Sequence, residues 1–293
     1  MPLTLDALNA ASEADFVAAL GAIFEHAPWV AEAAAARRPF GSVEALFAAM
    51  REAVLAAPAA RRLALLQGHP ELAGRSARAG TIAADSIAEQ AAAGLDRLSE
   101  AEYARFAALN AAYAETFGFP FILCIKRHGR ASLLRQFETR LSSDAARERE
   151  TAEAEILRIA AIRLDALVEG EGRLRTTGRL STHVLDTVAG RPAAGVVVEL
   201  AEIVGDESVT VARTVTNADG RTDSPLIGGR PVPIATYELR FYIGAYFCRT
   251  GLTLPDPAFL DVVPIRFGVA EPEGQYHVPL VASPWSYQTY RGS

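Results

Sequence analysis

The spacing of the apolar residues changes once along this chain, near residue 168, from a helical to a strand-like pattern. Before that point the sequence is rich in Ala, and apolar residues recur at the spacing of amphipathic helices. After residue 178 short runs rich in Val and Thr alternate with Gly and Pro turns, which is typical of β-strands. The 293 residues suffice for about two domains. We therefore expect an all-α domain over 1–168, an exposed linker over 169–178 and an all-β domain over 179–293.

Local signals place the individual elements, with about seven or eight helices in the first part. Helices with clear boundaries are expected from a Ser12 cap to about Glu25, from a Ser42 cap through Val54, from Arg61 to Leu66 before Gly68, from a capping box of Ser99 and Glu102 to Gly118, and from about Ser143 to Leu167. Strands of a sandwich-like set are expected over Leu180–Asp186, Gly195–Val204, Val209–Thr216, Thr236–Ile243, Asp261–Phe267 and Gln275–Ala282.

Composition and charge exclude several classes of protein. A net charge of -6 argues against a nucleic-acid scaffold, which is normally basic. The cysteines Cys124 and Cys248 are far apart and form neither a disulfide framework nor a zinc motif, which fits a reducing cytoplasm. The N-terminus lacks a signal-peptide pattern, and no apolar run approaches the roughly 20 residues of a membrane span. We expect a cytoplasmic protein, and the abundance of Ala and Arg favours a bacterial source.

Two motifs in the helical part have both a structural and a functional interpretation. His69 lies on a loop between Gly68 and Pro70, where it can act as a C-terminal helix cap or as a reactive group. Ser86 opens a helix with Glu89 three residues later, which is either a capping box or a site for an anion on free backbone donors. Taken alone, each motif favours the structural interpretation.

Arg163 is the third candidate in the helical part. It follows Ile156 by seven residues and Ile159 by four, so it points where the core of the last helix should be. A buried guanidinium needs a carboxylate partner or a ligand. Two structural explanations account for Arg163 as well as a ligand does. The guanidinium can pair with a structural Glu, or the aliphatic part of the side chain can pack on the core while the guanidinium stays in water.

Together these residues resemble the 2-oxo-4-hydroxy-4-carboxy-5-ureidoimidazoline (OHCU) decarboxylases. The resemblance covers about residues 5 to 168 and implies an all-α fold. It rests on Gly68-His69-Pro70 with Leu72-Ala73, Ser86-x-x-Glu89-Gln90, Leu109-Asn110-x-x-Tyr113, Phe117-Gly118-Phe119-Pro120-Phe121-Ile122 and Arg163-Leu164.

The resemblance also implies an active site. His69 would be the general acid, and Arg163 would hold the substrate carboxylate bidentately. Glu89 would either orient or charge the imidazole or bind the ureido group. Further substrate contacts would come from Pro70, Ser86 and Gln90, and from the backbone donors of Phe121, Ile122, Leu123, Cys124 and Ile125, which would stabilise the electron density left by loss of carbon dioxide.

Four polar residues and the chain end stand out in the strand part. Ser181 and His183 share one face of the first strand, because side chains alternate with a period of two. Arg221 follows an Asp-Gly turn, and His277 lies in the last strand. Taken singly, each is a solvated polar residue. The end is unusual, because aromatic residues continue to Tyr290-Arg291-Gly292-Ser293 where most chains fray.

This set resembles the 5-hydroxyisourate hydrolases, the enzyme branch of the transthyretin-like fold. The resemblance rests on Thr-His-Val-Leu-Asp at His183, on Arg221 after its turn, on His-Val-Pro-Leu at His277 and on the Tyr-Arg-Gly-Ser tail. It implies a β-sandwich in which one or both histidines activate a water and Arg221 polarises the attacked carbonyl. Tyr290, Arg291 and Ser293 would line the pocket. The family is tetrameric, which implies a homo-oligomer through this domain.

The two resemblances describe consecutive reactions of urate degradation. The strand part would hydrolyse 5-hydroxyisourate to OHCU, and the helical part would decarboxylate OHCU to S-allantoin. Neither a metal nor a cofactor is expected, and neither nucleic acid nor a membrane is an expected partner. Two alternatives remain open. In the first, only one domain is catalytic and the other is a scaffold. In the second, the chain is a transthyretin-like ligand carrier, which would not need His183, Arg221 and His277.

Overall fold

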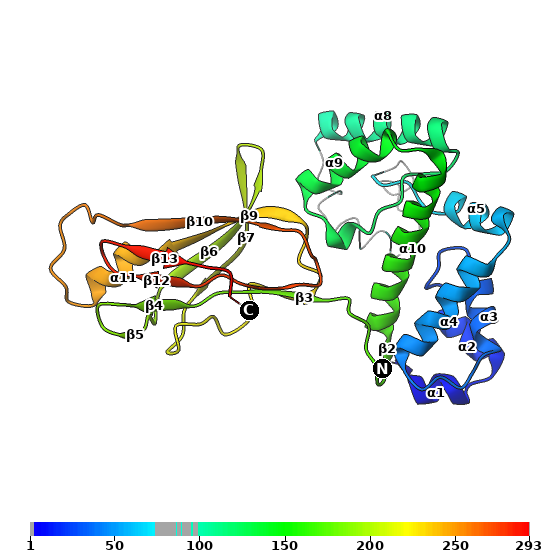
Figure 1. Ribbon diagram of the computed structural model, residues 1–293, viewed down its shortest axis with the longest axis horizontal. Helices are drawn as coiled ribbons and strands as arrows, with labels where there is room; N and C mark the ends of the chain where they lie inside the picture. Colours follow the sequence, from blue (N-terminus) through cyan, green and yellow to red (C-terminus); the bar gives the residue numbers. More distant parts are fainter. Residues whose placement is uncertain (1–2, 74–85, 87–88, 90–94, 96–98, 293) are drawn as a thin grey trace. The chain divides into compact units, whose positions relative to one another are not determined.

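The change of apolar periodicity near residue 168 corresponds to two structural units of different class (Figure 1). The computed structural model describes residues 3–73, 86, 89, 95 and 99–292. The first unit comprises Met1–Ile125 and Leu134–Thr176, and the second comprises Lys126–Leu133 and Thr177–Ser293. Within the described residues, no helix is long and apolar enough to cross a membrane.

Polar caps start the main helices of the first unit. The side chains of Ser12, Ser42 and Ser99 accept backbone N–H groups from the first turns of α2, α4 and α8, and Ser99 forms the predicted capping box with Glu102. The described elements up to residue 169 are β1 (Leu3–Thr4), α1 (Leu5–Ala10), α2 (Glu13–Leu20), α3 (Trp29–Ala35), α4 (Val43–Ala56), α5 (Ala59–Gln67), α8 (Glu100–Phe117), the 3₁₀ turn η2 (Ile125–Arg127), α9 (Arg130–Leu141), α10 (Ala145–Leu167) and β2 (Val168–Glu169).

One predicted helix boundary is wrong. The helix that starts at the Ser12 cap ends at Leu20 and not near Glu25, because the chain turns at Gly21, whose N–H bonds to the Val17 carbonyl. The apolar residues that follow are buried outside the helix. Glu25 is therefore carried into the interior by a loop.

An aromatic cluster around Tyr113 of α8 forms part of the core of the first unit. The Tyr113 ring lies 4.7 to 6.1 Å, between centroids, from the rings of Phe117, Phe119, Phe121 and Phe137. Edge-on arrangements of this kind are favourable because the positive ring edge meets the negative ring face. The cluster fixes the chain that leaves α8 and leads to residues 121–125.

The stretch 169–178, predicted as an exposed linker, is largely exposed but is tied to the first unit. β2 pairs in parallel with β1, and the N–H groups of Val43 and Glu44 bond to the carbonyls of Glu171 and Gly172. Arg173 donates from Nε to Asp165 Oδ1 at 2.9 Å. The hydrogen bonds of this stretch give it a defined path that its Gly-rich sequence does not indicate.

The second unit is a two-layered β-structure. One layer has the strand order β10-β9-β6-β7, and the other contains the sheets β11-β3-β8 and β13-β12-β4-β5. The described elements are β3 (Gly178–Ser181), β4 (Val184–Asp186), β5 (Arg191–Pro192), β6 (Val197–Val204), β7 (Glu207–Val215), β8 (Ile227–Arg230), β9 (Ala235–Tyr242), α11 (Ile243–Arg249), β10 (Val262–Val269), β11 (Gln275–His277), β12 (Leu280–Ala282) and β13 (Tyr287–Thr289).

Two predicted strands are each divided. The strand expected over Leu180–Asp186 is β3 and β4, and the strand expected over Gln275–Ala282 is β11 and β12. β3 and β11 are parallel neighbours, as are β4 and β12, so both interruptions lie at the same level of the layer. The helix α11 was not predicted.

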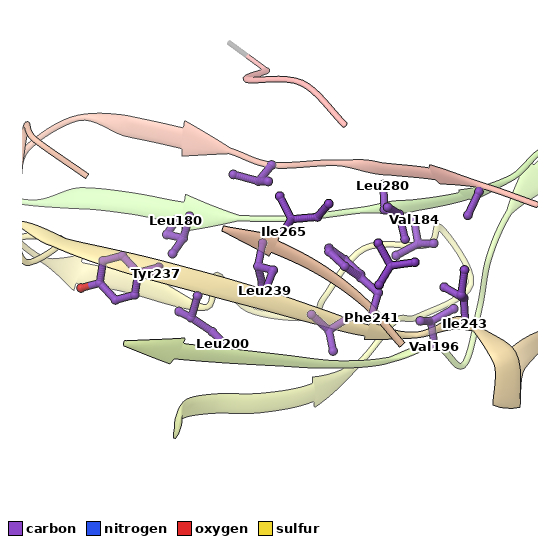
Figure 2. Close-up of a cluster of buried hydrophobic side chains, with 14 of the residues drawn as sticks. Leu180, Val184, Val196, Leu200, Tyr237, Leu239, Phe241, Ile243, Ile265 and Leu280 are labelled. Carbon is purple, nitrogen blue, oxygen red and sulfur yellow. The ribbon is translucent and has the colours of Figure 1, made fainter. Parts of the chain in front are cut away.

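The core of the second unit lies between the two layers (Figure 2). Leu200, Leu239 and Phe241 are completely buried and come from the central strands of one layer. Leu180 and Leu280 face them from the other layer. The alternation of buried and polar residues along these strands therefore sets which side chains point away from the core.

A short segment from the first half of the sequence, Lys126–Leu133, belongs to the second unit. The N–H of Ile234 bonds to the Arg127 carbonyl at 2.8 Å, and the N–H of Gly129 bonds to the Ile234 carbonyl at 3.1 Å. Arg127 also donates from Nε and Nη2 to the two carboxylate oxygens of Glu273. The segment is therefore grouped with the second unit, although it lies within the stretch 1–168.

Gly220 precedes Arg221 and is expected to be sensitive to substitution. Its φ of +67° is in the left-handed region, and a Cβ would lie 2.4 Å from the Val184 carbonyl oxygen. Gly220→Ala should destabilise the second unit by roughly 2–5 kcal/mol, because steric overlap adds to the backbone strain. Gly205→Ala is the matched control, since Gly205 has a φ of +61° and open space, and it should cost about 1 kcal/mol. Chemical denaturation of the full chain measures both, and equal losses would contradict the steric argument.

Candidate functional site

Arg163 is the centre of a buried polar cluster in the helical unit. It projects from α10 and is only 8% exposed. Its Nε and Nη2 donate to the two carboxylate oxygens of Glu89 at 3.2 and 3.0 Å, and Nη2 also donates to Ser86 Oγ at 3.1 Å. The side chains of Ser86 and Glu89 thus meet Arg163, whereas sequence reasoning alone favoured a local capping box.

Glu25 completes this cluster and was missed from the sequence. It is 6% exposed, and its Oε2 accepts the Ser86 hydroxyl at 2.7 Å and lies 3.6 Å from Arg163 Nη1. Its Oε1 has no hydrogen-bond partner among the residues that the structure describes. The one available signal was a carboxylate directly after the apolar pair Ile23-Phe24. Two carboxylates and a hydroxyl therefore share one guanidinium.

His69 lies beside the same cluster, on the loop after α5. Burial, together with the nearby positive charges of Arg163 and His26, lowers the pKa of His69 to about 3. The imidazole is therefore neutral at physiological pH in the free protein. An anion bound next to Arg163 would offset the charge of the guanidinium and favour protonation of His69.

The predicted substrate-binding run 121–125 is fixed by buried charges. All five side chains are buried. Cys124 N–H donates to Glu155 Oε2 at 2.9 Å, and Arg140 donates to the Ile122 carbonyl at 2.8 Å. The Cys124 N–H is therefore hydrogen-bonded inside the protein. Pro70 is half-buried next to His69, and Gln90 lies outside the described residues.

The second site is a chain of three side chains in the strand unit. Ser181 Oγ is 3.0 Å from His277 Nδ1, and His277 Nε2 is 2.6 Å from His183 Nδ1. The parallel register of β3 and β11 pairs Ser181 directly with His277. Predicted residues that are 94 positions apart in sequence are thus in direct contact.

A turn brings Arg221 to the same place. The Asn217 side chain accepts the N–H of Arg221 at 3.1 Å, and the Gly220 carbonyl accepts the N–H of Val184. Arg221 forms an isolated antiparallel bridge with His183. The three predicted catalytic residues of this unit therefore lie together.

The chain end borders His277 on its other side. The N–H of Gly292 donates to the His277 carbonyl at 2.8 Å. A Cβ on Gly292 would lie 2.8 Å from His277 Cδ2, so the close approach requires glycine. Arg291 lies over the Tyr276 ring, and Tyr290 is 56% exposed. Ser293 lies outside the described residues.

Both histidines of the strand unit are neutral at pH 7. Partial burial lowers the pKa of each below its ordinary value of 6.5, and the charge of Arg221 lowers both. Arg179 of β3 acts in the same direction on His277. A neutral pair next to a cation can accept a proton from water while the cation holds an oxygen of the substrate. No cluster of three or more metal-ligating side chains occurs in the described parts of the chain.

Comparisons with known proteins divide the chain in the same way. The family model described as OHCU decarboxylase matches residues 9–165, and the model described as HIUase/Transthyretin family matches residues 180–292. The 5-hydroxyisourate hydrolase 2 of Rhizobium meliloti (strain 1021) is 52% identical over 117 residues, which are 40% of this chain and 98% of that protein.

Two further matches concern the helical part and the whole chain. The 2-oxo-4-hydroxy-4-carboxy-5-ureidoimidazoline decarboxylase of Haloferax volcanii is 41% identical over 162 residues, which are 55% of this chain and 94% of that protein. A crystal structure of (S)-allantoin synthase is 32% identical, covers 100% of both chains and has a TM-score of 0.51.

Replacement of Arg221 should change the titration of the histidine pair. Arg221→Gln removes a positive charge, so the pKa of His183 and of His277 should rise towards 6.5. The chain has only 5 histidines, which makes NMR titration of labelled imidazoles practical. Arg266→Gln is the control, because Arg266 pairs with Glu238 on the other layer and should leave both values unchanged. A pKa that stays constant or falls in Arg221→Gln would refute this electrostatic account.

Proposed function

The chain belongs to the OHCU decarboxylase family over residues 9–165 and to the HIUase/transthyretin family over residues 180–292, and from this we propose that it is a bifunctional enzyme of urate degradation. The strand unit hydrolyses 5-hydroxyisourate to OHCU. The helical unit then decarboxylates OHCU to (S)-allantoin. The observation that carries this proposal is the joining of both families in one chain, since the product of one reaction is the substrate of the other.

In the hydrolytic step, the neutral pair His183 and His277 takes a proton from the attacking water. Arg221 holds the carbonyl oxygen on which negative charge develops. The protonated pair then gives this proton to the ring nitrogen that leaves when the cyclic amide opens. Gly292, near the chain end, keeps His277 in position through its backbone hydrogen bond to the His277 carbonyl.

In the decarboxylation, Arg163 binds the carboxylate of OHCU. The charge of this carboxylate offsets the guanidinium, and His69 then becomes a better proton carrier than in the free protein. After carbon dioxide leaves, His69 protonates the ring carbon from one face, which sets the configuration of the product. Glu89 holds the guanidinium in the orientation that the substrate needs.

The two alternatives are less well supported. A transthyretin-like carrier has no need of a contacting histidine pair beside an arginine. A chain with one catalytic domain does not account for the second family match or for the buried cluster of Glu25, Ser86, Glu89 and Arg163.

We also propose that the chain is a homo-oligomer, a tetramer through its strand unit, in the cytoplasm of a bacterium. The support for the oligomer is an exposed aromatic surface on and next to the edge strand β13. Trp285, Tyr287 and Tyr290 are 58%, 44% and 56% exposed. Exposed aromatic residues at a strand edge are typical of surfaces that pair with a further copy.

Single substitutions should separate the two reactions. His277→Ala should slow enzymatic loss of 5-hydroxyisourate by roughly 10²–10⁴-fold, because it removes half of the proton-accepting pair. His69→Ala should leave that step intact and let OHCU accumulate. Fresh 5-hydroxyisourate is followed by absorbance and by circular dichroism against a blank without enzyme. Wild-type behaviour of both variants would refute the proposed function.

The tail should act only on the first reaction. Gly292→Ala places a methyl group against the His277 ring and should reduce hydrolysis at least roughly tenfold, since small displacements of a reacting group are costly. Deletion of residues 290–293 should have the same or a larger effect, with decarboxylation largely preserved. Gly268→Ala serves as the control, because a Cβ there meets nothing within 4 Å. An unchanged rate of hydrolysis in both tail variants would remove the tail from the mechanism.

A further inference from the structure

His277 uses both of its ring nitrogens inside the protein. Nδ1 contacts Ser181 Oγ at 3.0 Å, and Nε2 contacts His183 Nδ1 at 2.6 Å. The planes of the two imidazoles differ by 17°, with centroids 4.8 Å apart. The short nitrogen–nitrogen distance at this separation places the rings edge to edge, as an imidazole–imidazole hydrogen bond requires.

His183 is therefore the member of the pair that can meet water. Within the described residues, its Nε2 is the one ring nitrogen of the two imidazoles without a hydrogen-bond partner. Its ring is partly exposed, beside Arg221. For the hydrolysis proposed above, the base is then His183 Nε2, and His277 acts through its hydrogen bond to His183 Nδ1.

The hydrogen-bond chain has two possible directions. If the Ser181 hydroxyl donates to His277 Nδ1, His277 donates from Nε2 to His183, and His183 carries its own proton on Nε2. If His277 donates from Nδ1 to Ser181 Oγ, His277 Nε2 accepts from His183 Nδ1, and His183 Nε2 keeps a lone pair. Only the second direction gives a base that faces water.

We propose that Ser181 is a positioning residue of the hydrolase site, which accepts the Nδ1–H of His277 and thereby fixes the tautomer that leaves His183 Nε2 as the base. This inference rests on the proposed function for its reaction but not for its hydrogen bonds. Its chemical logic is that of a third group that orients a catalytic imidazole.

The proton transfers balance along this chain. Water gives one proton to His183 Nε2 as its oxygen bonds to the amide carbon. The Nδ1 proton of His183 moves towards His277 Nε2, and the charge of the imidazolium is shared with a ring whose Nδ1–H is bonded to Ser181. When the carbon–nitrogen bond of the ring breaks, the protons move back, and His183 protonates the leaving nitrogen.

Backbone hydrogen bonds hold Ser181 in place beside His277. The Ser181 carbonyl accepts the N–H of Val278 at 3.0 Å, next to the register pair of Ser181 and His277. On the opposite face of the strand, the Thr182 hydroxyl donates to the Val278 carbonyl at 2.7 Å. Thr182 is therefore a matched control, because its hydroxyl bonds to the residue after His277 and, within the described residues, to neither histidine side chain.

The experiment uses the full chain with ¹⁵N-labelled histidine and four variants. In wild type, the ¹⁵N signals should show a protonated Nδ1 on His277. Ser181→Ala should mix the tautomers and lower kcat for 5-hydroxyisourate roughly tenfold with little change in KM, which is less than the loss of the base itself. Ser181→Thr keeps the acceptor and should restore both. Decarboxylation of OHCU should be unchanged throughout.

Two variants distinguish positioning from a structural role. Ser181→Asp should still accept the Nδ1–H, stabilise the imidazolium by its charge and shift the acidic limb of the rate profile to higher pH; the other charges that face the pair, Arg179 and Arg221, stay constant. Thr182→Val should lower the unfolding midpoint without altering tautomer or pH profile.

Several results would overturn the proposal. They are an unprotonated Nδ1 on His277 in wild type, an unchanged kcat in Ser181→Ala, or an equal effect of Ser181→Ala and Thr182→Val on the tautomer. A chain that does not hydrolyse 5-hydroxyisourate at all would instead refute the proposed function, and the ¹⁵N signals would still decide the direction of the hydrogen bonds.

Discussion

The cost of burying charge is the constraint on which the helical unit depends. Helix α10 carries Glu148, Glu155 and Arg163 into the interior, and such groups are tolerated only when they are paired and hydrogen-bonded. Glu148 meets Arg140, which also donates to the Ile122 carbonyl. Glu155 accepts the Cys124 N–H. The charged groups that are paired along α10 therefore also fix the run 121–125.

The site of the strand unit meets the same constraint by a different route, because its partly buried histidines are neutral. Partial burial and Arg221 lower the pKa of His183 and of His277, so the pair bonds without a net charge at pH 7. The neutral histidine pair can take up a proton, whereas the Arg163 guanidinium keeps its positive charge and lies between the carboxylates of Glu25 and Glu89. The two clusters thus differ in charge: the histidine pair is neutral, and the cluster around Arg163 is ionic.

Local patterns predicted the features that depend on nearby residues. The caps at Ser12, Ser42 and Ser99 are set by hydrogen bonds within one turn, and the inward position of Arg163 follows from helical spacing. Glu25 was missed because its partners lie 61 or more positions away and no period leads to them. The bond between the Cys124 N–H and Glu155 was missed for the same reason, since pairing across the fold leaves no local trace.

The hydrolase site shows most clearly what alternation in a sequence can and cannot determine. Period-two alternation places Ser181 and His183 on one face of their strand, and it separates His277 from Tyr276 and Val278 in the other. It does not fix how the two strands are aligned. In the observed parallel register, Ser181 lies opposite His277. A slip of one residue would turn His277 to the other face and bring Tyr276 or Val278 against Ser181. The contact between the histidines therefore depends on register, which the buried residues of both strands hold in place through the core.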